Sequence, residues 1–124
     1  MQKLLEQDIK IHPITKKTLD LFVKKVKEHE GDNLLRIILF CSVAREEANQ
    51  NSDIDVLVIL KECPFMKRME ICDICADIEW DMDFNENAYL QTLTMSEEES
   101  RGLDFYSLMI NVYREGVVLY DSEQ

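Results

Sequence analysis

The sequence predicts an α+β fold in which helices pack on a small mixed or antiparallel β-sheet. Two runs of β-favouring residues, 33–42 and 53–60, follow an amphipathic segment at 14–30. A second helical segment and a third extended run come after them. The chain has 124 residues, which fits one compact domain covering positions 1–124.

The first helix is predicted from its apolar spacing. Residues 14–30 place apolar side chains at positions i, i+3, i+4 and i+7, namely Leu19, Phe22, Val23 and Val26. Gly31 follows at the position where glycine commonly ends a helix. We therefore expect an amphipathic helix that packs one face on the sheet.

The two runs that follow this helix predict central strands. The sequences NLLRIILFCS and DIDVLVIL are almost continuously apolar, as expected for strands buried on both faces. The polar connection VAREEANQNS between them can hold a short helical turn and a loop. Such a connection allows the two strands to pair antiparallel.

The second half predicts two more strands and three helices. Residues 65–84 keep a helical period, and residues 88–95 alternate well enough for a third strand. Ser96, followed by three glutamates, is a good helix start. Residues 104–114 predict a last helix, and Gly116 ends it before a short VVLY strand.

The four cysteines include one CxxC pair, Cys72 and Cys75. This spacing can mark a redox pair or half of a zinc site. A zinc site needs a second ligand pair, and neither His12 nor His29 has the required spacing. Both cysteines fall on or beside an apolar helical stripe, so we favour buried free thiols and assign neither histidine a catalytic role.

The charge balance restricts the partners. The formal net charge of −11 repels polyanions, so we expect no nucleic-acid partner. We find neither a signal peptide at the N-terminus nor an apolar run of the roughly 20 residues that span a bilayer. We therefore expect a cytoplasmic location without membrane contact, and the acidity favours a basic protein partner.

Asp53 and Asp55 are the candidate chemical site. Side chains at i and i+2 of a strand point to the same face, which brings the two carboxylates together. Their charges repel unless a cation lies beside them. Oxygen-rich sites of this kind suit Mg²⁺ or Mn²⁺, completed by water and phosphate oxygens.

The surroundings of the two aspartates resemble the minimal nucleotidyltransferase (MNT) family of the DNA polymerase β superfamily. That family carries Gly-Ser, two residues, Arg-Gly, a short loop and Ser-Asp-x-Asp before an apolar strand. The matching positions here are Ser42, Ala44, Arg45, Ser52, Asp53 and Asp55. The closing segment DFYSLMINVYREGVVLY resembles the family's C-terminal segment, so the resemblance covers nearly the whole chain.

The resemblance implies a polymerase β palm-like fold and a role for each matching residue. Ser42, Arg45 and Ser52 would bind the nucleotide, while Asp53 and Asp55 would be catalytic and hold Mg²⁺ or Mn²⁺. The implied reaction transfers a nucleoside monophosphate, AMP from ATP, to a hydroxyl of another molecule. In many members the acceptor is a HEPN-type RNase toxin and the transferase is its antitoxin, and the resemblance leaves the oligomeric state open.

Three positions depart from the family pattern. Cys41 and Glu46 replace the two glycines, and a Cβ there obstructs close approach to a phosphate. The family's third carboxylate falls near Gln91 if residues 88–95 form the third strand. If EWDMDF were that strand instead, Asp81 or Asp83 would supply it. We prefer the first alignment, so the alternative function is a catalytically impaired module that neutralises a partner by contact.

Overall fold

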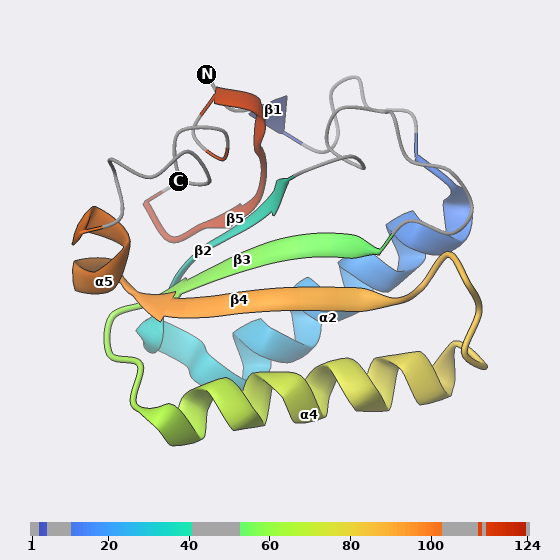
Figure 1. Ribbon diagram of the computed structural model, residues 1–124, viewed down its shortest axis with the longest axis horizontal. Helices are drawn as coiled ribbons and strands as arrows, with labels where there is room; N and C mark the ends of the chain where they lie inside the picture. Colours follow the sequence, from blue (N-terminus) through green and yellow to red (C-terminus); the bar gives the residue numbers. More distant parts are fainter. Residues whose placement is uncertain (1–2, 5–10, 41–52, 103–111, 113, 124) are drawn as a thin grey trace.

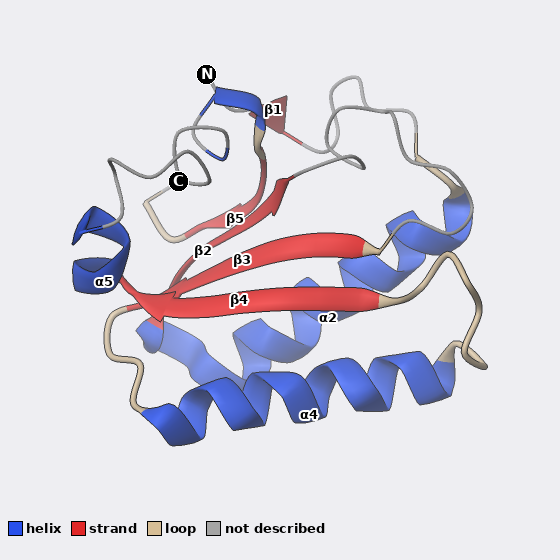
Figure 2. Ribbon diagram, viewed as in Figure 1, coloured by secondary structure: helices blue, strands red, loops and turns tan. Residues whose placement is uncertain are grey.

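The computed structural model describes residues 3–4, 11–40, 53–102, 112 and 114–123. Its helices and strands form two layers, with α2 and α4 on one face of a five-stranded sheet (Figures 1 and 2). The elements are β1 (Lys3–Leu4), α2 (Pro13–Glu30), the 3₁₀ turn η1 (Gly31–Asn33), β2 (Leu34–Phe40), β3 (Ile54–Leu60), α4 (Phe65–Asp81), β4 (Leu90–Ser96), α5 (Glu97–Gly102) and β5 (Val117–Asp121). The expected α+β class is confirmed.

The sheet is mixed and has the strand order β1-β5-β2-β3-β4. Strand β2 pairs antiparallel with both β3 and β5, whereas β3 and β4 are parallel. The parallel pair is joined by α4, because parallel strands need a long crossover connection. The prediction that β2 and β3 are central antiparallel neighbours is therefore confirmed.

The helix α2 has recognisable signals at both ends. The Nδ1 atom of His12 accepts a hydrogen bond from the Ile14 backbone N–H at 3.1 Å, and Pro13 occupies the first helical position. Gly31 ends the helix with φ of 54°, a left-handed conformation that favours glycine.

Within the described residues, no helix combines the length and apolar character needed to cross a bilayer.

Helix α5 begins directly after Ser96, the residue that the sequence predicted as a helix start. The Glu99 backbone N–H donates to the Ser96 hydroxyl oxygen at 3.0 Å, and the Ser96 backbone N–H donates to the Glu99 carboxylate at 3.1 Å. This reciprocal pair is a capping box. It fixes the point at which β4 ends and α5 begins.

The core lies on both faces of the sheet. On the helix-covered face, alternate residues of β3 pack with α2 and α4: Ile54, Val56, Val58 and Leu60 are buried with Leu19, Phe22, Val26, Ile71, Cys75 and Ile78. On the opposite face, Leu57 and Ile59 pack with Ile38, Phe40, Met95 and Val112. Every second side chain of β3 therefore points away from the helix layer.

The C-terminal strand β5 returns beside β2, as the VVLY segment predicts. Gly116 immediately precedes it, and its backbone N–H donates to the Val112 carbonyl oxygen at 2.8 Å. Most of the last helix expected from sequence, over 104–114, lies outside the described residues.

Candidate functional site

The two candidate aspartates lie where β3 begins. Asp53 is exposed and precedes the first residue of the strand, while Asp55 is half-buried inside it. Asp55 alternates in phase with Leu57 and Ile59, so it faces away from α2 and α4. Their Cα atoms are about 6.6 Å apart along an extended chain, which brings both carboxylates to one end of the sheet.

The neighbours of Asp55 across the sheet are fixed by the strand register. Phe40 of β2 is its partner on one side, and Gln91 of β4 is its partner on the other. Directly paired residues in adjacent strands present their side chains to the same face. Gln91 therefore occupies the position beside Asp55 that the preferred sequence alignment assigned to it.

The alternative prediction that EWDMDF forms the third strand is wrong. Asp81 is the last residue of α4, and Asp83 lies in the turn that follows. Glu79 in the last turn of the same helix accepts a hydrogen bond from the Leu90 backbone N–H at 3.1 Å. This carboxylate therefore helps to fix the start of β4.

The expected nucleotide-binding loop lies outside the described residues. It contains Ser42, Arg45 and Ser52 as expected ligands of the nucleotide, and Cys41 and Glu46 as departures from the glycine pattern. Their roles stay predictions from sequence.

The donor atoms that the described part of the site presents are suited to a hard cation. Asp53 and Asp55 offer carboxylate oxygens at the start of β3, and Gln91 adds an amide oxygen or nitrogen at the position paired with Asp55. Mg²⁺ and Mn²⁺ prefer such oxygen ligands, and Mg²⁺ commonly retains several waters beside one or two carboxylates.

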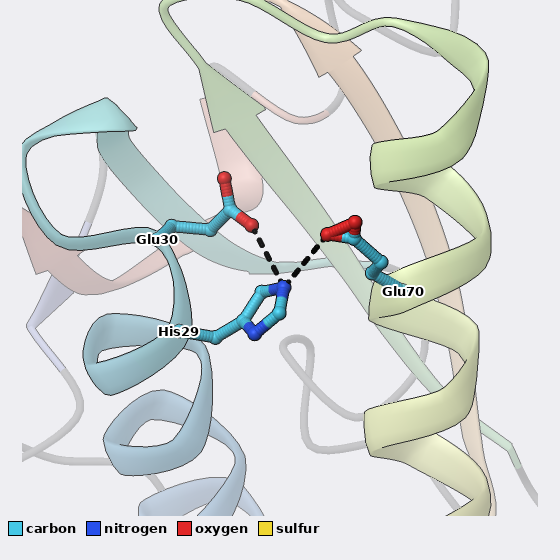
Figure 3. A group of neighbouring side chains, drawn as sticks. All are labelled: His29, Glu30 and Glu70. Atoms are coloured by element: carbon cyan, nitrogen blue, oxygen red, sulfur yellow. Dashed lines mark hydrogen bonds and ion pairs between the residues drawn. The ribbon is translucent and has the colours of Figure 1, made fainter.

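A second polar cluster, which the sequence did not reveal, joins α2 to α4. The Nε2 atom of His29 lies 2.9 Å from Glu70 Oε1 and 3.4 Å from Glu30 Oε2 (Figure 3). These residues could hold a metal ion by their spacing. The Lys67 ammonium, however, lies 3.4 Å from Glu30 Oε2 and 3.6 Å from Glu70 Oε1.

This ion-pair network already contains its own counter-charge. The hydrogen bond with His29, together with the charge of Lys67, lowers the pKa of Glu70. The negative charge of Glu30 raises the pKa of Lys67. The Glu30 side chain is completely buried, and Asn33 donates to its other oxygen at 2.9 Å. We therefore interpret the cluster as a link between the two helices, at the end of the sheet away from Asp53.

The CxxC cysteines do not share one environment. Cys75 is buried against the sheet, as expected, but Cys72 is exposed, so the prediction of two buried thiols is only half right. Burial raises the pKa of the Cys75 thiol to about 12. Because the thiolate is the reactive form, burial disfavours reaction of Cys75 at neutral pH. This environment favours a structural role over a redox one.

Comparison with known proteins gives the same family as the motif. A model of the family described as "Polymerase beta, Nucleotidyltransferase" matches residues 20–124. Two proteins of Methanocaldococcus jannaschii, each named "Putative protein adenylyltransferase", are similar in sequence. MJ1305 is 45% identical over 60 residues, which span 48% of this chain but only 40% of MJ1305. MJ0141 is 33% identical over 89 residues, which span 67% of this chain and 90% of MJ0141.

Two solved structures share the fold at low sequence identity. A "putative nucleotidyltransferase" from Sulfolobus solfataricus is 20% identical, with a TM-score of 0.54 over 90% of this chain and 86% of that one. A chain from the complex of a tri-AMPylated Shewanella oneidensis HEPN toxin with its MNT antitoxin is 17% identical, with a TM-score of 0.50 over 89% of this chain and 75% of that one. With its fold, its sheet-end aspartates and the family match over most of its length, the chain belongs to the polymerase β nucleotidyltransferase family.

Proposed function

We propose that this protein is a divalent-cation-dependent adenylyltransferase that moves AMP from ATP to a hydroxyl of a partner protein. The observation that carries the proposal is the position of Asp53 and Asp55 two residues apart at the start of β3, with Asp55 on the sheet face away from α2 and α4. The names of the two M. jannaschii relatives support protein adenylylation. The AMPylated complex among its structural neighbours supports a HEPN-type toxin as the acceptor, with this chain as antitoxin.

The roles of the chain's own residues follow from that reaction. Asp53 and Asp55 would hold Mg²⁺ or Mn²⁺, and the bound ion would supply charge stabilisation at the reacting phosphate. Ser42, Arg45 and Ser52 would bind the phosphates. The acceptor oxygen forms a bond to the α-phosphorus while the bond from that atom to the β-phosphate oxygen breaks. Pyrophosphate leaves, and the hydroxyl proton passes to solvent or a nearby base.

A second function is favoured by one feature of the same site. The residue beside Asp55 is the neutral Gln91, so the described part of this sheet face presents two carboxylates at the site rather than three. A site with fewer anionic ligands holds a dication less tightly. The competing proposal is therefore a catalytically impaired module that binds its partner and neutralises it by contact.

A transfer assay tests the proposed activity. The protein is incubated with ATP labelled at the α-phosphate, Mg²⁺ or Mn²⁺, and the purified product of the adjacent gene. We expect label on that partner, with a loss of at least about 100-fold in Asp53→Asn because a metal-binding charge is removed. Asp32→Asn is the matched control, since Asp32 is an exposed aspartate in the 3₁₀ turn η1, which follows α2.

Calorimetry separates the two functions. An active site should bind ATP with Mg²⁺, and the heat should disappear in Asp53→Asn but persist in Asp32→Asn. If the wild-type protein binds and neutralises its partner but shows neither nucleotide heat nor transfer, the contact-only function replaces the enzymatic one.

A further inference from the structure

Three exposed aromatic residues gather at the same end of the sheet as the aspartates. Trp80 is 72% exposed, Phe84 is 52% exposed and Tyr89 is 39% exposed. They come from the last turn of α4 and from the turn that leads into β4 (Figure 1). We refer to these three residues as the aromatic patch. Large aromatic side chains are seldom this exposed in groups unless they contact a partner.

The backbone connects the aromatic patch directly to the candidate site. The Ile54 backbone N–H, between the two aspartates, donates to the Tyr89 carbonyl oxygen at 2.8 Å. Two residues further on, Gln91 pairs with Asp55. A protein bound on the aromatic patch would therefore lie next to the expected reaction centre.

The turn that carries Phe84 is held in an unusual conformation. Asp83 and Phe84 both have positive φ, 60° and 52°, although neither is glycine. The Tyr89 hydroxyl donates to the Phe84 carbonyl oxygen at 2.9 Å and braces this turn. The Phe84 and Trp80 rings meet edge to face with centroids 5.7 Å apart. A costly backbone conformation that keeps a phenylalanine exposed is typical of functional surfaces.

Acidic side chains surround the aromatic residues. The segment 77–89 contains five acidic residues and no lysine or arginine. Four of these acids are exposed: Asp77, Asp81, Asp83 and Glu86. Aromatic rings bind lysine and arginine cations through their faces, and carboxylates pair with the same cations. This surface therefore complements a positively charged partner and repels a second copy of a chain with net charge −11.

We infer that the aromatic patch docks a lysine- and arginine-rich segment of the protein that supplies the acceptor hydroxyl. The inference rests on the proposed function for the identity of that protein. The charges and aromatic rings of this surface account for its binding. Docking there orients the acceptor toward the end of the sheet where Asp53 and Asp55 lie.

Intrinsic fluorescence tests the docking directly, because Trp80 is the only tryptophan in the chain. The full chain is titrated with a short peptide in which arginine and lysine alternate with serine. The same peptide with glutamate in place of its basic residues is the control. We expect a saturable change in Trp80 fluorescence with the basic peptide alone.

Matched variants separate this surface from general charge attraction. The double variant Asp81→Asn/Asp83→Asn should weaken peptide binding at least about tenfold. Asparagine also tolerates the left-handed conformation at position 83. The control Glu28→Gln/Asp32→Asn removes the same charge from exposed positions at the other end of the molecule and should change affinity little. Equal loss in the two double variants would overturn the inference.

Substitution of two exposed phenylalanines by alanine tests the location of the docking surface without changing the charge of the protein. Phe84→Ala should weaken binding, whereas Phe65→Ala should not, although Phe65 is 71% exposed on the same helix. Phe65 and Trp80 are separated by about 22 Å along α4. Equal effects of the two substitutions would show that the docking surface is not at this end of α4.

The readouts also distinguish failure of docking from failure of catalysis. Asp53→Asn should bind the basic peptide normally while losing transfer. With the partner protein, Phe84→Ala should raise the KM for the acceptor and leave ATP binding unchanged. Self-association that disappears in Phe84→Ala would assign the surface to a second copy and overturn the inference.

Discussion

Replacement of Gln91 by glutamate tests whether this position is electrostatically coupled to Asp55. The paired strands are about 4.8 Å apart, so two carboxylates on the same face would lie roughly 5 Å from each other. At this distance the repulsion is about 0.8 kcal/mol in a water-like dielectric and about 3 kcal/mol at an effective dielectric of 20. Because Gln91 is exposed and Asp55 half-buried, we expect a loss of about 1 kcal/mol in the free energy of unfolding.

Urea denaturation at low salt measures this loss. Low salt matters because exposed charges are screened over about 10 Å at 0.1 M ionic strength. A loss of about 1 kcal/mol lowers the urea midpoint by roughly 0.5 M for a typical dependence of stability on denaturant. If a dication binds between the carboxylates, Mg²⁺ or Mn²⁺ should restore the stability of Gln91→Glu, and the gain should exceed that of the wild type.

A double-mutant cycle isolates the interaction of this pair. Gln91→Glu is made again in the Asp55→Asn background, where the carboxylate paired directly with position 91 is absent. The destabilisation and the added response to dications should both largely vanish there. Equal destabilisation in the two backgrounds would refute the proposed coupling, as would a Gln91→Glu variant that unfolds like the wild type with or without Mg²⁺.

The remaining predictions concern stability. Gly116→Ala places a Cβ 2.3 Å from the Val112 carbonyl oxygen, so urea denaturation should show a loss of about 3 kcal/mol; Gly102→Ala, with nothing within 4 Å of the added Cβ, should not destabilise. Asp83→Gly relieves a positive φ of 60° and should add about 0.5–1 kcal/mol in the same assay. The hydrogen bond from the Ser96 backbone N–H lowers the pKa of Glu99 in the folded protein. The Glu99 carboxylate therefore stabilises the folded protein at pH values above its unfolded pKa. This stabilisation is lost as the pH falls through the lower folded pKa. Thermal unfolding of Glu99→Gln should therefore show a smaller decrease on acidification below pH 4.5, the ordinary glutamate value, than the wild type does.

The sequence predicted the elements whose apolar residues follow a strong period. Residues 33–42 and 53–60 contain β2 and β3, and residues 65–84 contain α4. These segments are buried on one or both faces, so their pattern reflects the core directly. Two of the predicted ends, at residues 60 and 65, agree with the structure, and the others differ by at most three residues. The exact end of a helix or strand depends on hydrogen bonds that periodicity does not report.

The direction of β4 could not be inferred from its own residues. Alternation is the same in parallel and antiparallel strands, so the segment 88–95 indicated a strand without its orientation. The helical connection between β3 and β4 decides this orientation, since it returns the chain to the end where β3 began. The parallel register then places Gln91 beside Asp55.

Long-range polar contacts were missed for a different reason. His29 and Glu70 are 41 residues apart and meet only because α2 packs beside α4. Neither the period nor a local motif contains that information. The positive φ of Phe84 was also hidden, because bulky side chains rarely adopt that conformation.

The crossover through α4 links the two proposals physically. The helix runs back along the sheet and finishes at the end where β3 begins (Figure 1), so the turn that follows enters β4 at the end of the sheet that carries Asp53 and Asp55. The same turn therefore sets which residue lies beside Asp55 and where Trp80 and Phe84 are exposed. A partner bound on this turn would contact the segment that fixes the register of Gln91. In the proposed function, acceptor binding and the geometry of the site therefore both depend on one short stretch of backbone, the turn between α4 and β4.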